Sequence, residues 1–140
     1  AIESTKLIIK NQPGLLCTLP WSVLWKLYAS LEVHTKVFDD IKTRLLAVFE
    51  FIEDIRVKLT EERQSSMALF DKTYKVSLEI KVKGSERWIP QSQISSGVLK
   101  TLLFISEVEF APDGTVFLID EFENSLGVNC LDVVTDQLFG

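Results

Sequence analysis

Cysteine and histidine are scarce in this chain of 140 residues, which has two cysteines, Cys17 and Cys130, and one histidine, His34. The cysteines are not spaced as a metal-binding motif requires, so the sequence encodes neither a zinc site nor a disulfide framework. Such cysteine usage is typical of a reducing compartment, and we expect a cytoplasmic protein. We interpret the lone histidine, near a helix boundary, as a partly exposed helix residue, not as a catalytic base or metal ligand.

Long hydrophobic runs are missing as well. Charged residues, among them Lys26 and Lys100, interrupt the apolar stretches well before the ~18 residues that a transmembrane helix needs. The chain starts at Ala1 without the pattern of a signal peptide. We therefore expect a protein that is neither secreted nor associated with a membrane.

The chain also lacks a surplus of positively charged residues. The chain has 15 Lys and Arg against 20 Asp and Glu, which gives a formal net charge of −5. An autonomous nucleic-acid binder needs a concentrated basic face, so any contact with DNA is expected through other parts of the protein. Hydrophobic residues, by contrast, make up 46% of the chain. That is enough for one globular domain, or part of one, with a sizeable core.

Residues 1–53 predict a mainly helical segment. An apolar run at residues 7–9 predicts a short strand, which a Pro-Gly pair ends. Two helices are predicted next, one over about residues 21–31 and one from about Thr35. The first carries aromatic residues at helical spacing, which we interpret as core contacts and not as a partner-binding face: Trp21, Trp25 and Tyr28. The second carries an apolar stripe: Val37, Ile41, Leu45, Val48, Phe49 and Ile52.

Residues 54–90 have the alternation of antiparallel strands with one solvent-exposed face. Apolar residues alternate with charged or polar ones over residues 55–59 and again over residues 74–82. Residues 67–70 are a candidate third strand, and residues 88–90 are predicted to be extended because a proline closes them. Basic residues of this region are interpreted as a solvated face, not as a phosphate-binding site: Lys81, Lys83 and Arg87.

Residues 91–140 predict a helix, a turn, a buried strand and a further helix. The first helix runs from about Gly97 to Val108, and an Ala-Pro-Asp-Gly turn follows it. Residues 115–119 are a continuous β-prone apolar run, typical of a strand that is buried on both faces of a parallel sheet. Residues from about 128 to 138 predict the last helix. The expected fold class is therefore α/β, with a mixed sheet, flanking helices, a parallel core and an antiparallel β portion.

Two short segments of this last region form a candidate phosphate site. The predicted strand ends in Asp120 and Glu121, which places two carboxylates at the carboxyl edge of a sheet, where open α/β sheets bind ligands. Upstream, the Ser-Ser-Gly sequence at residues 95–97 opens a helix, whose backbone N–H groups and hydroxyls suit an anion. Each segment alone is weak, since ordinary helix caps and polar strand ends have the same residues. Their order and spacing together are more specific.

A nuclease site is the competing interpretation of the acidic residues Asp120, Glu121 and Glu123. Such a two-metal site needs a second cluster of carboxylates, and the sequence does not offer one. We therefore favour the phosphate site.

At these residues the sequence resembles a known class of ATPases. Residues 94–102, Ile-Ser-Ser-Gly-Val-Leu-Lys-Thr-Leu, resemble the signature motif of ATP-binding-cassette ATPases. Residues 116–121 resemble their Walker B strand, and residues 122–126 resemble the D-loop that follows it. The sequence Asp-Glu-x-Glu-Asn-Ser-Leu is more similar to that of the SMC-like branch than to that of transporters. This branch includes RecF, the OLD nucleases and the PtuA-type defence ATPases. Residues 49–57 and 88–90 also look like the OLD and PtuA group.

The resemblance implies a role for each matching residue. Asp120 would take part in Mg²⁺ coordination, and Glu121 would be the catalytic carboxylate. The signature residues would contact the γ-phosphate of ATP held by the opposite subunit: Ser95, Ser96 and Gly97. The D-loop residues would line the dimer seam and link the two sites: Asn124, Ser125 and Leu126. ATP and Mg²⁺ are the implied cofactors, and a homodimer or higher oligomer is the implied assembly.

Two parts of such an ATPase are missing from the sequence. It contains no GxxxxGK[ST] loop to cradle the β- and γ-phosphates, and no histidine follows the D-loop. We therefore interpret the chain as the C-terminal half of an ATPase head, an incomplete P-loop NTPase fold that should be inactive alone.

The complete protein is expected to bind and hydrolyse ATP with Mg²⁺ and to act with DNA. The leading expectation is anti-phage defence together with a nuclease or other effector protein. Two alternatives stay open: a DNA repair or recombination ATPase of the RecF type, and a non-enzymatic, ATPase-like scaffold.

Overall fold

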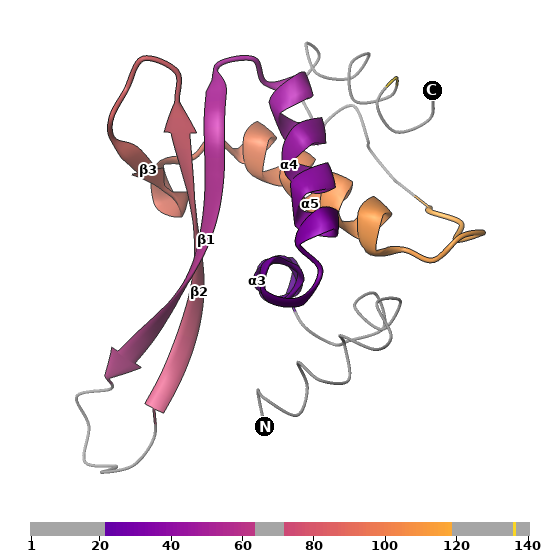
Figure 1. Ribbon diagram of the computed structural model, residues 1–140, viewed down its shortest axis with the longest axis horizontal. Coiled ribbons are helices and arrows are strands. Elements are labelled where there is room, and N and C mark those ends of the chain that lie inside the picture. The colour runs from indigo at the N-terminus through magenta and orange to yellow at the C-terminus, as the bar shows by residue number, and fades with distance from the viewer. Residues whose placement is uncertain (1–21, 64–71, 119–135, 137–140) are drawn as a thin grey trace.

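A helical layer covers one face of a three-stranded sheet (Figure 1). The computed structural model describes residues 22–63, 72–118 and 136. The elements follow in the order α3 (Val23–Val33), α4 (Thr35–Val48), β1 (Ile52–Arg63), β2 (Lys72–Val82), β3 (Trp88–Pro90), the 3-10 helix η1 (Gln91–Gln93) and α5 (Ser96–Phe110). The strands predicted at residues 7–9 and 67–70 lie outside the described residues. So does the helix predicted near residues 128–138, except Asp136, which is helical.

The sheet is antiparallel, with β2 between β1 and β3. Alternate residues of β1 and β2 are buried: Ile55, Val57, Val76, Leu78 and Ile80. The alternation predicted from the sequence is thereby confirmed. β1 extends beyond the predicted end because the hairpin keeps its register out to Arg63 and Lys72. This distal end projects past the helices (Figure 1), and Tyr74 there is 40% exposed.

A single residue, His34, separates the first two described helices. Its φ of −134° interrupts the helical backbone. Its N–H donates to the Ser30 carbonyl at 2.7 Å, and its carbonyl accepts from the Val37 N–H at 2.9 Å. The side chain has intermediate exposure, so the predicted partial exposure near a helix boundary is confirmed, but His34 lies between α3 and α4 and belongs to neither helix.

The buried stripe of α4 differs from the predicted one at both ends. Phe38, not Val37, is buried at the start of the helix, together with Ile41 and Leu45 further along. Helical neighbours face different directions, so only one of two adjacent apolar residues can point fully at the core. Ile52 is buried as a residue of β1, because α4 already ends at Val48.

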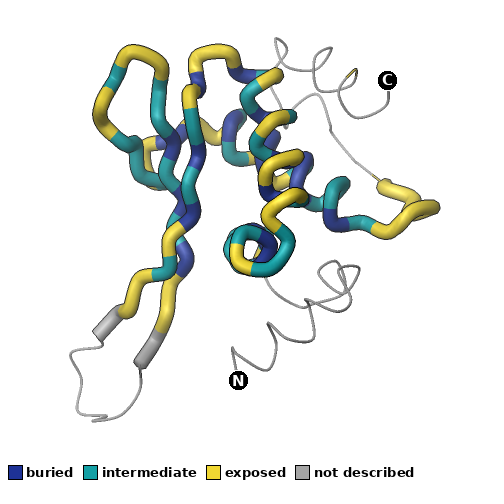
Figure 2. The backbone as a smooth tube through the Cα atoms, in the orientation of Figure 1, coloured by how far each residue is buried: buried dark blue, intermediate teal, exposed yellow. Residues whose placement is uncertain are grey.

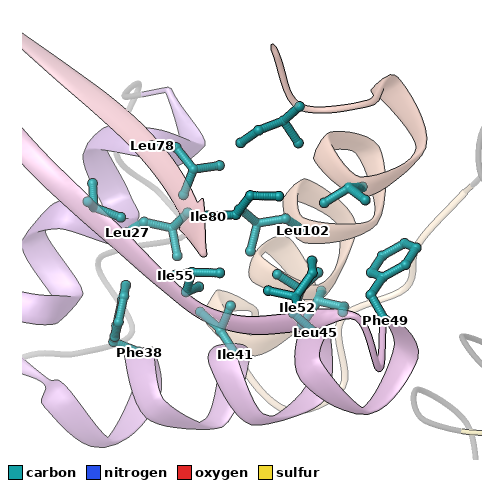
Figure 3. Close-up of a cluster of buried hydrophobic side chains, with 14 of the residues drawn as sticks. Leu27, Phe38, Ile41, Leu45, Phe49, Ile52, Ile55, Leu78, Ile80 and Leu102 are labelled. Atoms are coloured by element: carbon teal, nitrogen blue, oxygen red, sulfur yellow. The ribbon is translucent and has the colours of Figure 1, made fainter. Parts of the chain in front are cut away.

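One cluster of apolar side chains joins the helices to the sheet (Figure 3). The largest fully buried apolar members come from α3, α4, α5, β1 and β2: Leu27, Ile41, Leu45, Ile52, Leu78, Leu102 and Ile105. Trp25 and Tyr28 pack against this cluster as partly buried residues, with their rings edge to face at 6.3 Å. The interpretation of these two aromatic residues as core contacts is confirmed, while Trp21 lies outside the described residues.

A charged pair also connects α3 to α5. Lys26 is only 5% exposed, and its Nζ lies 3.4 Å from Oε1 of Glu107. The aliphatic stem of a lysine covers apolar surface, while its ammonium group needs a partner when it is taken out of water. The pair therefore helps to fix how α5 lies against α3.

The sequence predicts a buried strand at residues 115–119, of which the structure describes residues 115–118. Those four residues do not form a strand. Residues 115–118 have no regular secondary structure, and Val116 and Leu118 are 81% and 96% exposed (Figure 2). A strand of this kind forms only where neighbouring strands bond to its edges and helices cover its faces. The sheet of the described residues contains β1, β2 and β3 alone. The α/β class is confirmed for this part of the chain, but with an antiparallel sheet; the predicted parallel strand is wrong for residues 115–118.

Candidate functional site

The described half of the candidate phosphate site lies at the start of α5. Ser95 is the N-cap residue, with an extended backbone of φ −61° and ψ 148°. Its Oγ accepts a hydrogen bond from the Val98 N–H at 3.4 Å, and its carbonyl accepts from the Leu99 N–H at 3.1 Å. The predicted helix start is confirmed, and Ser95 caps it in the ordinary way.

The next two residues leave donors at this helix end. Ser96 and Gly97 take the first helical positions, where backbone N–H groups have no acceptor within the helix. Ser95 and Ser96 are exposed, and Gly97 has intermediate exposure. These N–H groups, the serine hydroxyls and the positive end of a 15-residue helix dipole suit a phosphate oxygen. The described residues therefore fit the group that the resemblance implies.

A short path connects this helix start to the edge of the sheet. β3 pairs with β2 over three residues, η1 follows at once, and Ile94 then joins the core at 8% exposure. The Ile94 N–H donates to the Gln91 carbonyl at 3.2 Å. The position of residues 95–97 thus depends on β3 and on the burial of Ile94.

The other half of the candidate site lies outside the described residues: Asp120, Glu121, Asn124, Ser125 and Leu126. The turn that leads towards them is described, and Gly114 has a φ of +85°, which favours glycine. The predicted turn is confirmed there. Of the candidate site the structure describes the signature residues 95–97, and the roles of the carboxylates and of the D-loop stay predictions.

The described residues hold neither a metal-binding cluster nor a membrane-spanning helix. Across residues 22–63, 72–118 and 136, three or more His, Cys, Asp or Glu side chains never come together as metal ligands would. Among the helices that the structure describes, none has the length and apolar character to cross a membrane.

The outer face of the sheet carries a cluster that sequence reasoning missed. Arg56 of β1 lies beside Glu79 of β2, and its Nε donates to Glu79 Oε2. Lys58 places its Nζ 2.8 Å from the same oxygen. The Arg56 guanidinium also lies over the Trp88 ring of β3, 3.9 Å from the ring centroid, close enough for a cation–π interaction. The Arg56, Glu79 and Trp88 side chains therefore connect all three strands.

Of the basic residues that were interpreted as a solvated face, Lys81 is the register partner of Trp88. Lys81 forms an ion pair with Glu53 at 3.0 Å, and this hydrogen bond raises the pKa of Lys81. Lys83 and Arg87 are exposed in the segment between β2 and β3. Their exposure agrees with a solvated face.

Because of Glu79, the free energy of unfolding should decrease as the pH falls in the acid range. Its hydrogen bond from Lys58, above all, and that from Arg56 hold its pKa below the ordinary 4.5 despite partial desolvation. A carboxyl with a lowered folded-state pKa stabilises the fold above its unfolded pKa, and this contribution disappears as the pH falls through the folded value. Urea unfolding of the wild type should therefore show a decline below about pH 4.5 that is shallower in Glu79→Gln. An equally steep decline in the variant would contradict the assignment, and Lys58→Met should give an intermediate slope.

Helices on one face of an antiparallel sheet, with an exposed Ser-Ser-Gly helix start next to the sheet edge, define an α/β domain with a candidate anion site. A family model described as "AAA domain, putative AbiEii toxin, Type IV TA system" matches residues 26–128, which is more than half of the chain. The chain belongs to this family. The match supports an ATPase domain of the P-loop, ABC-like class, and it covers both the start of α5 and the predicted carboxylates.

No curated protein and no solved structure matches the chain.

Proposed function

We propose that this chain supplies the signature half of a Mg²⁺-dependent, dimerising ATPase of the SMC-like, ABC-class type. The observation that carries the proposal is the exposed Ser-Ser-Gly start of α5, residues 95–97, inside the region that matches an ATPase-type family. In such a protein these residues contact the γ-phosphate of ATP through backbone N–H groups and hydroxyls.

The carboxylates that follow residues 115–118 complete the proposed site. Asp120 would coordinate Mg²⁺, and Glu121 would polarise the water that attacks the γ-phosphate. Bound Mg²⁺ would neutralise charge on the phosphates. Asn124, Ser125 and Leu126 would line the seam between two subunits. The sequence order from signature to Asp-Glu to D-loop supports this assignment.

The missing phosphate loop supports an assembly of more than this segment. A GxxxxGK[ST] sequence does not occur among the 140 residues, so the cradle for the β- and γ-phosphates must come from another segment or another chain. In a sandwich of two complete heads, that loop would hold the nucleotide on one subunit, and the signature residues 95–97 of the other subunit would meet its γ-phosphate.

Within this class we propose a defence role on DNA with a nuclease or other effector partner. The family description supports a related role, since it names a putative AbiEii toxin and a type IV toxin–antitoxin system. The net charge of −5 favours DNA contact through other parts of the protein. A repair ATPase of the RecF type remains the alternative within the same chemistry.

Turnover of ATP by the product of the complete gene tests the proposal. Hydrolysis should require Mg²⁺ and stop with a chelator, and the 140-residue chain alone should show none, because it lacks the phosphate loop. Turnover should also rise more than linearly with protein concentration if two subunits form each site. A complete protein that neither binds nor hydrolyses ATP would instead identify the chain as an ATPase-like scaffold.

A further inference from the structure

We propose that Arg56, Glu79 and Trp88 form a clamp that positions the start of α5 for its phosphate contact. The inference rests on the proposed function, and it assigns a positioning role to three residues outside the signature, Walker B and D-loop segments. They lie on the outer face of the sheet, opposite the helices.

The clamp compensates for a weakly attached edge strand. β3 has three residues and, within the part of the chain that the structure describes, pairs on one side only, with β2. Pro90, its last residue, has no N–H to donate to the ladder. Side-chain contacts must therefore supply much of what holds this strand in place, and the Arg56 guanidinium, 3.9 Å from the Trp88 ring centroid, provides one.

Glu79 fixes the direction of the Arg56 side chain. Glu79 is the register partner of Arg56 across β1 and β2, and it accepts a hydrogen bond from Arg56 Nε. Its pKa is lowered, so the carboxylate stays charged at neutral pH and keeps this bond. The carboxylate is also 2.8 Å from Lys58 Nζ, which holds it from a second side. The guanidinium is thus oriented over β3 by Glu79 of β2, which Lys58 of β1 also holds in place.

The connection from β3 to the signature residues is short enough to transmit a displacement. η1 begins directly after Pro90, and Ile94 is buried before Ser95 caps α5. Ser95 and Ser96 are exposed, so the core does not hold their side chains. A shift of β3 therefore becomes a shift of the N–H groups and hydroxyls that meet the phosphate, and small misplacements of reacting groups cost much rate.

Hydrogen exchange on the full chain tests the clamp without any nucleotide. The informative amides are those of Ile94, Val98 and Leu99, which are hydrogen-bonded around the start of α5. Trp88→Ala and Arg56→Gln should make them exchange about tenfold faster, because loss of the stacking contact loosens β3. Trp88→Phe keeps an aromatic face and should preserve protection. Unchanged exchange in both disruptive variants would overturn the proposal.

Arg44→Gln is the matched control. Arg44 pairs with Glu109 at the far end of α5, and its side chain is 37% exposed, the same fraction as that of Arg56. The same substitution there should leave the three amides protected. Equal loss of protection in Arg44→Gln would mean that any weakened ion pair loosens the helix, and the clamp would have no special role.

Kinetics of the complete ATPase then test whether the position matters for the reaction. Arg56→Gln should lower kcat about tenfold and leave KM for ATP nearly unchanged, since the signature residues meet the γ-phosphate and not the nucleoside. A wild-type kcat in a variant with loosened amides would overturn the positioning role. An inactive wild type would count against the proposed function, whereas the exchange experiment would still decide whether the clamp holds α5.

Discussion

Replacing Glu121 with Gln should slow ATP turnover by the complete protein about 10²- to 10⁴-fold, the range that a positioned acid–base group contributes. Gln has nearly the shape of Glu but carries no negative charge, so it cannot polarise the attacking water. ATP binding should persist, because the carboxylate acts on the water and not on the nucleotide. Turnover and nucleotide affinity, measured on one preparation, separate these two effects.

Asp113→Asn is the matched control for the loss of one negative charge. Asp113 is exposed in the turn that follows α5, and its side chain lies in the loop that leads towards the candidate carboxylates. Turnover in this variant should stay within about twofold of the wild type, since surface substitutions of this kind cost little. If Glu121→Gln hydrolyses ATP as fast as Asp113→Asn does, Glu121 is not the catalytic carboxylate.

Local sequence patterns predicted the elements whose form depends on residues close along the chain. The period of two over residues 74–82 gave the correct buried side of β2. The cap at Ser95 and the apolar spacing after it predicted α5. The turn at Gly84, with a φ of +78°, needed only the conformational freedom of glycine. In each case the physical cause lies within a few residues.

Features that depend on distant partners could not be predicted in this way. The apolar run at residues 115–118 has the composition of a buried strand, yet a strand requires partners on its edges, and the composition does not say where they are. The choice of Phe38 over Val37 for the core depends on where α3, α5 and β1 pack against α4. A sequence pattern contains neither piece of information.

The clamp on the outer face could not be predicted from local sequence patterns either. Arg56 and Glu79 are partners because the hairpin pairs β1 and β2 in one particular register, and Trp88 joins them only when β3 pairs with β2. From the sequence alone, charged residues at alternate positions predict nothing more than an exposed face. The signature residues 95–97 could be proposed from the sequence because their order and spacing relative to residues 120–121 carry the signal, and their role stays a prediction.

Leu102→Ala should lower the free energy of unfolding by about 2–5 kcal/mol, the usual cost of removing a fully buried leucine side chain. Leu102 of α5 is 0% exposed, and Figure 3 shows its side chain inside the cluster that joins the helices to the sheet. Because Leu102 is one of the α5 side chains that hold the helix in this cluster, the cavity should also weaken the hold on the first turn of α5. Urea unfolding followed by circular dichroism measures the cost, provided that the slope with denaturant is unchanged.

Leu103→Ala removes the same atoms one position further along the helix. Leu103 is 37% exposed, so water already contacts much of its side chain and little cavity forms. Its cost should stay below about 1 kcal/mol, with helix propensity changed equally in both variants. The difference between the two variants therefore isolates burial at Leu102. Equal costs would place Leu102 outside the core and would contradict the arrangement of α5 on which the candidate phosphate site depends.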